Sequence, residues 1–175
     1  PQVVVCKRAQ PLKVEVVVRG CLAGSLMRES KENRGQKYGL RIDPDLKEFN
    51  KFAEPILTPS TKADLGDHDT PISRAEILNS NLIVRKTWEE IEEKAIALFK
   101  MGSEIAKKRG LYLVDTKYEF GIFDNKLILI DELHTSDSSR FYSIDDYHQK
   151  IKVDQAPKML DKEFLRRYLM ENGFD

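Results

Sequence analysis

The sequence lacks the features that mark a secreted, membrane-spanning or nucleic-acid-binding protein. It contains only two cysteines, Cys6 and Cys21, whose spacing suits neither a metal site nor a disulfide framework. Lys plus Arg and Asp plus Glu are equal at 29 each, so no net charge attracts nucleic acid or a membrane surface. No apolar run approaches the roughly 18 residues that cross a bilayer. We therefore expect a cytoplasmic protein with reduced, buried structural thiols, and with neither nucleic acid nor membrane as a partner.

The sequence does contain enough apolar material for a folded domain. Of its 175 residues, 41% are apolar and 33% are charged, which is typical of a globular protein with a real core. The chain begins without an initiator Met and inside a strand-like run, Val3–Val5. This start predicts that the sequence is part of a longer protein.

The first third of the chain predicts one strand, one short helix and a long irregular stretch. The β-branched run Val14–Val18 is typical of a buried strand. Residues 20–29 predict a turn that leads into a short helix with Ser25 as its N-cap. Residues 30–72 are polar and show no strong periodicity, so only loops or short strands are expected there.

The clearest helix signal covers residues 87–109. Thr87 and Glu90 have capping-box spacing, and Gly110 is a suitable stop. The apolar residues at helical spacing on one face are Trp88, Ile91, Ala95, Leu98, Phe99 and Ile105. A shorter capped helix is predicted for residues 73–79.

A β-hairpin is predicted after this helix. Residues 111–120 and 126–132 have strand character, and Phe123–Asn125 has turn chemistry. The chain then ends in a short amphipathic helix over residues 161–171, whose apolar residues are Phe164, Leu165, Tyr168 and Leu169. These elements predict an α+β fold in which helices flank an antiparallel sheet.

The hairpin carries the most informative charges. Asp115, Lys117 and Glu119 alternate with other residues, which places them on one face of a strand. With a turn near Asn125, Glu119 lies about opposite Asp131, and the two carboxylates converge. Converging carboxylates favour a cation between them, and hard oxygen ligands favour Mg²⁺. A solvated strand face with cross-strand salt bridges explains the same pattern.

Two further clusters suit anion binding. Arg19 ends the predicted strand and precedes Gly24 and Ser25, so its guanidinium and the backbone amides can meet one phosphate. Residues 137–140, Asp-Ser-Ser-Arg, place Arg140 beside two hydroxyls. Ordinary polar turns explain both clusters as well. His68 invites a general-base role, although a lone loop histidine is more often only solvated.

Several segments, taken in order, resemble the SAICAR synthetase family, also called phosphoribosylaminoimidazole-succinocarboxamide synthase. The resemblance covers nearly the whole chain. The matching segments are Glu15–Gly20, Ala23–Ser25, Glu54–Ala63, His68–Asp69, Asp115–Gly121, Asp131–Glu132, Asp137–Arg140 and Asp161–Arg166.

The resemblance implies a reaction in which ATP, CAIR (a carboxylated aminoimidazole ribonucleotide) and L-aspartate give SAICAR, ADP and phosphate. It implies that Glu119 and Asp131 hold Mg²⁺ and nucleotide, and that Lys117 lies beside the phosphates as the third catalytic residue. Lys7 falls in a hinge that meets adenine. Residues 1–12 would be this hinge, and residues 13–175 the domain that binds ATP, Mg²⁺ and CAIR.

The resemblance also implies a substrate side. Arg19 and Ser25 would bind the CAIR phosphate, Arg140 would bind substrate, and Lys62 and Asp69 would belong to a substrate loop. Asp137 and Lys162 complete the substrate-binding set. This agrees with phosphoryl transfer, which needs positioning and charge neutralisation more than a protein nucleophile.

The sequence departs from the family at both ends and at single positions. From the resemblance we expect that an N-terminal lobe, with a Gly- and Lys-containing segment over the ATP phosphates, and a last C-terminal helix are missing from this sequence. Cys21 stands where the family commonly has an aromatic residue, Ser136 where it has Pro, and Tyr142 where it has Trp. An inactive nucleotide-binding remnant and another ATP-using small-molecule kinase are therefore the alternatives. We also expect an exposed apolar seam near Val3–Val5 and Val14–Val18, and hence homo-oligomers.

Overall fold

The computed structural model describes residues 3, 5–62 and 69–174. Within this part of the chain, the strands form one six-stranded antiparallel sheet in the order β3-β2-β1-β4-β5, and β6 pairs with a further stretch of β4. The strands are β1 (Gln10–Cys21), β2 (Lys51–Thr61), β3 (Thr70–Pro71), β4 (Leu111–Phe123), β5 (Lys126–Ile130) and β6 (Ser139–Ser143).

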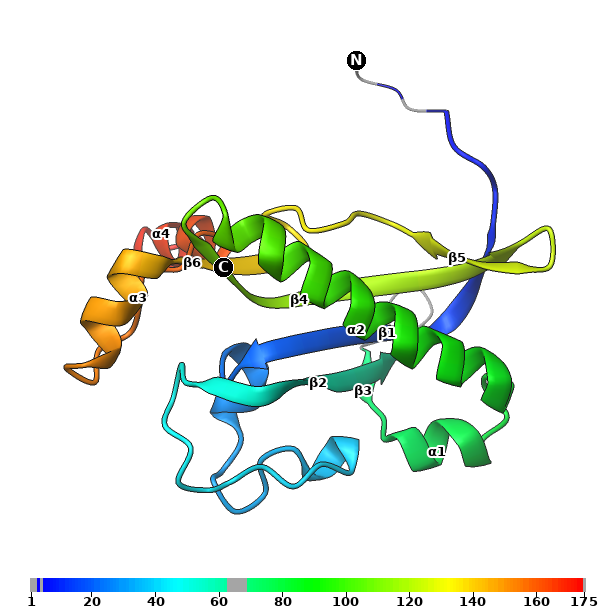
Figure 1. Ribbon diagram of the computed structural model, residues 1–175, viewed down its shortest axis with the longest axis horizontal. Coiled ribbons are helices and arrows are strands. Elements are labelled where there is room, and N and C mark those ends of the chain that lie inside the picture. Colours follow the sequence, from blue (N-terminus) through cyan, green and yellow to red (C-terminus); the bar gives the residue numbers. More distant parts are fainter. Residues whose placement is uncertain (1–2, 4, 63–68, 175) are drawn as a thin grey trace.

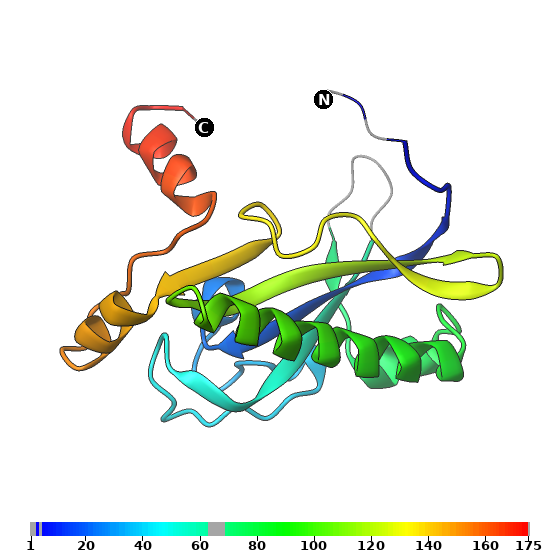
Figure 2. The same ribbon diagram turned by 45° about the horizontal axis from the view of Figure 1, so that its top comes forward.

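Helices flank the sheet, which confirms the predicted α+β class. The α-helices are α1 (Arg74–Asn79), α2 (Arg85–Lys107), α3 (Ile144–Ile151) and α4 (Glu163–Glu171), and the 3-10 helices are η1 (Gly24–Arg28) and η2 (Gln36–Tyr38). The long helix α2 lies along one face of the sheet, and α3 and α4 lie beyond the β6 end (Figures 1 and 2). No helix in the described part of the chain is both long and apolar enough to cross a membrane.

The core lies between α2 and the central strands. Side chains alternate along a strand, so every second residue of β1 and β4 points toward the helix. The buried residues that share this layer include Val14, Val16, Val18, Trp88, Ile91, Ala95, Phe99, Tyr118 and Phe120. Each buried large apolar side chain stabilises the fold by roughly 1.5–3 kcal/mol. The intervening residues point to the other face of the sheet, away from α2, and they include Glu15, Arg19, Lys117 and Glu119.

The expected apolar seam at Val14–Val18 was wrong. Val14, Val16 and Val18 are at most 2% exposed, because α2 covers them. Val3 and Val5 are 79% and 98% exposed, as expected for that end of the seam. Strand β1 also crosses the boundary drawn between residues 12 and 13, and that division of the chain stays a prediction.

The irregular stretch predicted for residues 30–72 contains a long strand. Strand β2 covers 11 residues and pairs with β1 on one side and β3 on the other. Its strand signal is weak because Pro55 and Pro59 interrupt it, and few of its side chains are fully buried. Its structure is imposed by pairing with β1 rather than by local preference.

Two predicted details of helix α2 need correction. Helix α2 begins at Arg85 after Val84, without a side-chain cap, so the Thr87 capping box was wrong. Ile105 is 56% exposed and lies off the buried face. The predicted C-terminal helix is present as α4, and Leu165 and Tyr168 on its apolar side are more than half exposed. Phe164, predicted for the same side, lies outside the described side chains.

The short helix α1 behaves as predicted. Ser73 is its N-cap and accepts a hydrogen bond from the backbone of Glu76. The Glu76 side chain accepts in return from the Ser73 backbone N–H at 2.8 Å, which completes a capping box. Helix α1 thereby positions the chain between β3 and α2.

Candidate functional site

Five charged side chains meet on the face of the sheet opposite α2, and we call them the carboxylate cluster: Glu15, Lys62, Lys117, Glu119 and Asp131. The Lys117 Nζ atom lies 2.5 Å from Glu119 Oε1, 3.4 Å from Asp131 Oδ2 and 3.5 Å from Glu15 Oε2. Lys62 contacts the second oxygen of Glu119. The predicted convergence of Glu119 and Asp131 is therefore confirmed, with Lys117 between them.

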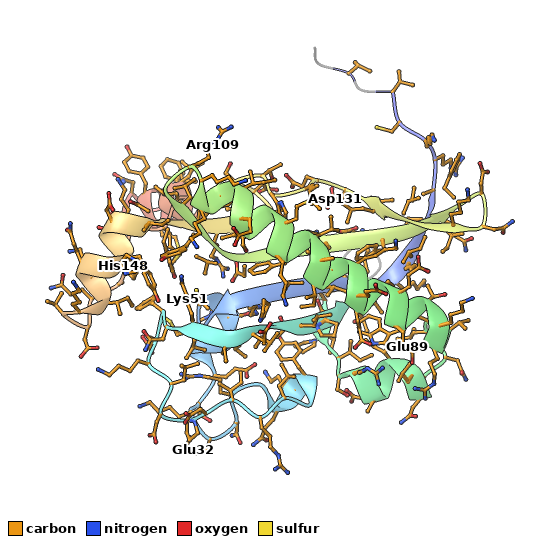
Figure 3. All side chains as sticks on the ribbon, in the orientation of Figure 1. Glu32, Lys51, Glu89, Arg109, Asp131 and His148 are labelled. Carbon is orange, nitrogen blue, oxygen red and sulfur yellow. The ribbon has the colours of Figure 1, made fainter. Side chains whose placement is uncertain are left out.

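The predicted pairing across the hairpin was off by one residue. Glu119 pairs with Ile130 rather than Asp131. Asp131 follows the last residue of β5, where Figure 3 labels it, and its backbone is left-handed with φ 65°. This turn in the backbone brings the Asp131 carboxylate to Lys117, although a simple continuation of the strand would point it to the same side as Phe120.

Glu15 belongs to the cluster but was not predicted to belong to the site. It sits directly opposite Glu119 in the β1–β4 pairing and is only 9% exposed. Ser60 Oγ donates a hydrogen bond to its Oε1 at 2.9 Å. The sequence signal that could have identified Glu15 is its place as a single acid within the β-branched run Val14–Val18, because a carboxylate is rarely buried without a partner.

The charges of the cluster stabilise one another. Burial disfavours a charged Lys117, but the hydrogen bond to Glu119 and the charges of Glu119, Glu15 and Asp131 outweigh it and raise the Lys117 pKa. Burial also acts to raise the pKa of Glu119, but hydrogen bonds and charge from Lys117 and Lys62 lower it instead. Lys117 and Glu119 are therefore held in their ionised forms.

The donor chemistry of the cluster fits one hard divalent cation. Among the described residues, no group of three or more His, Cys, Asp and Glu side chains is arranged to hold a metal by itself. Mg²⁺, however, usually takes one or two carboxylates and fills its other positions with water and phosphate oxygens. Glu119 and Asp131 supply such a pair, and they already share one cation, the Lys117 ammonium group.

A second group, the arginine cluster, lies next to the first and consists of Arg19 on β1, Thr58 on β2, Asp115 on β4, Arg140 on β6 and Ser25 in η1. Arg19 donates from Nε to Thr58 Oγ1 at 2.9 Å, from Nη1 to Asp115 Oδ2 at 3.1 Å and from Nη2 to Ser25 Oγ at 3.0 Å. Arg140 Nη1 donates to the same Asp115 oxygen at 2.7 Å. One carboxylate thus joins two guanidinium groups.

Arg19 is nearly inaccessible, with 5% of its surface exposed. Burial lowers its pKa, partly opposed by the charge of Asp115. Ser25 is not the N-cap that the sequence predicted: Ala23 holds that position in η1, and the Ser25 hydroxyl accepts from Arg19. In this arrangement Arg19 positions Ser25 and Asp115, and Arg140 is the more accessible of the two arginines, with 27% of its side chain exposed.

Gly24 is where the chain comes closest to Arg140. Its φ is +64°, and a Cβ atom there would overlap the Arg140 guanidinium. Only glycine meets both conditions without strain. The backbone at Gly24 therefore lies directly against the Arg140 guanidinium.

Asp137, Arg140 and Lys162, which the resemblance assigns to substrate binding, lie close together in the structure. Lys162 Nζ donates to Asp137 Oδ1 at 2.8 Å, and this bond lowers the Asp137 pKa. Arg140 Nε lies 3.4 Å from Asp161 Oδ2. These residues line a small cavity of about 60 Å³ together with Asp115, Ser138 and Ser139.

Lys7 and Asp69 are not members of either cluster. Lys7 is exposed and lies 5.1 Å from the centre of the Phe123 ring, near the tip of the hairpin. Asp69 directly precedes β3. His68 lies outside the described residues. Cys21 is buried, but Cys6 is exposed, which corrects the prediction of two buried thiols.

The chain is similar to known proteins over its whole length. The family model described as SAICAR synthetase matches residues 1–175. Phosphoribosylaminoimidazole-succinocarboxamide synthase of Bacteroides thetaiotaomicron is 45% identical over 174 residues, which are 99% of this chain and 55% of that protein. The chain therefore spans about half the length of the curated relatives it matches.

Solved structures agree with the sequence comparison. SAICAR synthase from Saccharomyces cerevisiae, complexed with SAICAR, superposes with a TM-score of 0.76 and 36% identity, covering 94% of this chain and 52% of that one. A type-2 SAICAR synthetase in complex with ADP superposes with a TM-score of 0.68 and 28% identity, covering 91% of this chain and 57% of that one.

Proposed function

The chain belongs to the SAICAR synthetase family, and from that premise we propose that the protein containing it joins L-aspartate to CAIR with cleavage of ATP. The products are SAICAR, ADP and phosphate. The observation that carries the proposal is the convergence of Glu119 and Asp131 on one cation position, beside a cluster of arginines on the same sheet face. Those two features suit a metal-bound nucleotide and an anionic substrate, respectively.

The two clusters are close enough for transfer of a phosphoryl group between their ligands. Asp115 and Lys117 are two positions apart on β4, which corresponds to about 7 Å along a strand. Strand β1 runs beside β4 through both clusters, because Arg19 pairs with Asp115 and Glu15 pairs with Glu119. A nucleotide held at the carboxylate cluster would thus lie next to a substrate held by Arg140.

Glu119 and Asp131 would hold Mg²⁺, which when bound neutralises phosphate charge. Lys117 and Lys62, both in contact with Glu119, would neutralise the charge that develops on the transferred phosphoryl group. Arg140, with Ser25 positioned by Arg19, would bind the phosphate of CAIR and orient its carboxylate. The substrate carboxylate would be phosphorylated first, and the aspartate amine would then displace phosphate.

The supporting side chains have a positioning role in this proposal. Asp115 fixes both guanidinium groups, and Glu15 fixes Lys117 with help from Ser60. Asp137, Lys162, Asp69 and Lys7 remain predicted contacts of substrate or nucleotide. A cytoplasmic location and a homo-oligomeric state are part of the same proposal.

The proposal is tested by removing the carboxylates one at a time. Calorimetry should show that Glu119→Gln and Asp131→Asn weaken Mg-ATP binding by about tenfold or more, because each removes a charged ligand. Glu93→Gln, an exposed acid on α2, is the matched control and should bind normally. Unchanged nucleotide affinity in both site variants would rule out the metal assignment.

A turnover assay separates the ligase from other ATP-using enzymes. Release of ADP and formation of SAICAR should both require CAIR, ATP and L-aspartate. Arg140→Met should raise the KM for CAIR while leaving nucleotide affinity unchanged. ATP-dependent phosphorylation of a stable product without aspartate would instead identify a small-molecule kinase.

A further inference from the structure

The segment that joins β5 to β6 (yellow in Figure 2) passes along the edge of β4. Strand β5 pairs with β4 as far as Ile130, and β6 pairs with it from Ser139 onward. Residues 131–138, which we call the bridging segment, lie between these two pairings. Neighbouring residues of a strand point to opposite faces, so Lys117 of β4 faces the carboxylate cluster and Tyr118 faces the core under α2. The bridging segment is therefore placed to contact both faces of the sheet.

The bridging segment contacts each face through one side chain. Asp131 Oδ2 lies 3.4 Å from Lys117 Nζ on the site face. Three residues later, His134 Nε2 lies 2.6 Å from the Tyr118 hydroxyl on the opposite face. Asp131 and His134 both have left-handed backbones, with φ 65° and 54°. This conformation costs free energy in residues other than glycine, and it persists where surrounding contacts hold it.

The contact of His134 is closely packed. Tyr118 is fully buried, and His134 is half-buried with its ring edge-on to the tyrosine, at 5.6 Å between ring centres. The other side of the ring lies against the backbone of α2, where a Cβ atom at Gly102 would overlap it. A ring that is packed in this way and hydrogen-bonded through Nε2 has little freedom to move. It therefore fastens the bridging segment to both β4 and α2.

The contact of Asp131 is weaker. Strand β5 ends at Ile130, so sheet pairing does not hold Asp131, and its carboxylate is partly exposed. Its ion pair with Lys117 is longer than the one that Lys117 makes with Glu119. Ion pairs in contact with solvent contribute little to stability, too little to hold a left-handed backbone by themselves. The buried contact of His134 is the stronger of the two.

We propose that His134 is a positioning residue that, through its contact with Tyr118, directs the Asp131 carboxylate to the cation position. The functional consequence rests on the proposed function, in which Glu119 and Asp131 share Mg²⁺. Glu119 is fixed by the pairing of β4 with β1 and β5, whereas Asp131 is fixed from the far side of the sheet. Groups that orient a metal ligand typically change metal affinity by 10- to 100-fold when they are removed.

The test compares a variant that removes the hydrogen bond with one that keeps it. In the complete protein, His134→Leu removes the ring nitrogen, whereas His134→Gln keeps an amide that can bond to the Tyr118 hydroxyl. Calorimetry should show that His134→Leu weakens Mg-ATP binding by about tenfold, and that His134→Gln stays within about twofold of the unmodified protein. Normal affinity in the Leu variant, or an equal loss in the Gln variant, would overturn the proposal.

Two further variants identify the route and exclude a general loss of stability. Tyr118→Phe should weaken Mg-ATP binding as His134→Leu does, and the double variant should be no weaker than either one, because both changes remove the same contact. Ile91→Val shortens a buried core side chain on α2, so it should lower the unfolding midpoint and leave the affinity unchanged. An equal loss of affinity in Ile91→Val would mean that binding follows overall stability, and would overturn a specific role of His134.

A measurement without nucleotide separates the role of His134 from the proposed function. In protein labelled with ¹³C-aspartate, the Asp131 carboxyl resonance, identified by its loss in Asp131→Asn, should be displaced in His134→Leu and largely restored in His134→Gln. An Asp131 resonance that stays in place in His134→Leu would overturn the positioning role. If Asp131→Asn binds Mg-ATP normally, the metal assignment fails, and a displaced resonance still supports the positioning of Asp131 by His134.

Discussion

At the scale of single residues, Lys117 lies at the centre of the proposed metal site. Its ammonium group contacts three acids that would otherwise repel one another. A divalent cation would therefore compete with the Lys117 ammonium group for these carboxylates. This arrangement keeps Glu119 and Asp131 close together before any nucleotide binds, and it makes the cluster sensitive to the loss of one lysine.

Replacing Lys117 by Met should reveal this competition. The variant should be less stable by about 1 kcal/mol, because like charges remain close together. Added MgCl₂ should restore its unfolding midpoint, and should raise that of the unmodified protein less. Equal responses to MgCl₂ in the two proteins would show that Lys117 does not occupy the cation position.

The buried arginine cluster should be far more sensitive to charge removal than the surface. Asp115→Asn leaves Arg19 and Arg140 without their shared carboxylate, and breaking such a buried pair costs about 3–5 kcal/mol. Glu90→Gln removes an exposed pair with Lys94 and should cost less than 1 kcal/mol by denaturant unfolding. Similar losses of unfolding free energy in the two variants would contradict the view that Asp115 is part of a buried charge network.

His134 should control part of the acid sensitivity. Burial lowers its pKa from the usual 6.5, and its Nε2 atom lies 2.6 Å from the Tyr118 hydroxyl. The unfolded chain takes up a proton near pH 6.5 while the folded protein resists it. Stability is therefore complete above that pH and is lost as the pH falls toward the lower folded pKa.

The variant His134→Gln should make unfolding free energy less dependent on pH between about 7 and 5. His148 is exposed, and His148→Gln is the matched control that should keep the original dependence. The measurement is denaturant unfolding at a series of pH values. An unchanged slope in the His134 variant would assign the acid sensitivity to other groups.

At the scale of elements, Gly102 shows how α2 fits the segment after β5. The His134 ring occupies the space of a Cβ atom at this helical glycine. Alanine normally stabilises a helix interior by about 1 kcal/mol relative to glycine. Here Gly102→Ala should destabilise the protein, because the ring would have to leave Tyr118.

A double-mutant cycle checks this fit. In a His134→Ala background, Gly102→Ala should become neutral or stabilising by up to about 1 kcal/mol, as helix propensity alone predicts. The measured quantity is the free energy of unfolding of all four proteins. Additive effects would mean that the helix and the His134 segment do not share this contact.

The hairpin was predictable as an element, but its register was not. Asp124 and Asn125 both have positive φ, which suits the two-residue turn that their side chains favour. Alternating charges identified the site face of β4 correctly. The predicted pairing of Glu119 with Asp131 was wrong by one residue, because the alternation of side chains along a strand does not fix where the turn begins. The left-handed backbone of Asp131 nevertheless brings its carboxylate to the site face.

At the scale of the whole molecule, exposed apolar side chains lie on both terminal segments. Val5 near the N-terminus is 98% exposed, and Leu165, Tyr168 and Met170 on α4 are each more than half exposed. In Figure 2 these segments lie on the side of the sheet away from α2. Apolar surface of this kind promotes association.

We therefore expect the protein to self-associate, with a sedimentation coefficient that increases with concentration. Replacing Leu165 and Tyr168 by Gln should lower the association, whereas Lys86→Gln on the exposed side of α2 should not. A single monomeric species at high concentration would contradict this prediction.

The sequence by itself determined the local features: the strand of β-branched residues, the long helix, the hairpin and the charged face of β4. These follow from periodicities of two and 3.6 residues, which each segment carries within itself. The family motifs also marked Arg19, Ser25 and Arg140 before their contacts were known.

Only the tertiary structure decided which of these residues meet. Arg19 and Asp115 are 96 positions apart, and Lys62 and Glu119 are 57 apart, so their contacts depend on the pairing of β1 with β2 and β4. The same is true of Glu15, which the pairing places opposite Glu119, and of Arg34, whose burial no local pattern indicated. Strand order and register arise from packing the whole chain, because the favourable energy of a distant contact appears only after the segments between have folded.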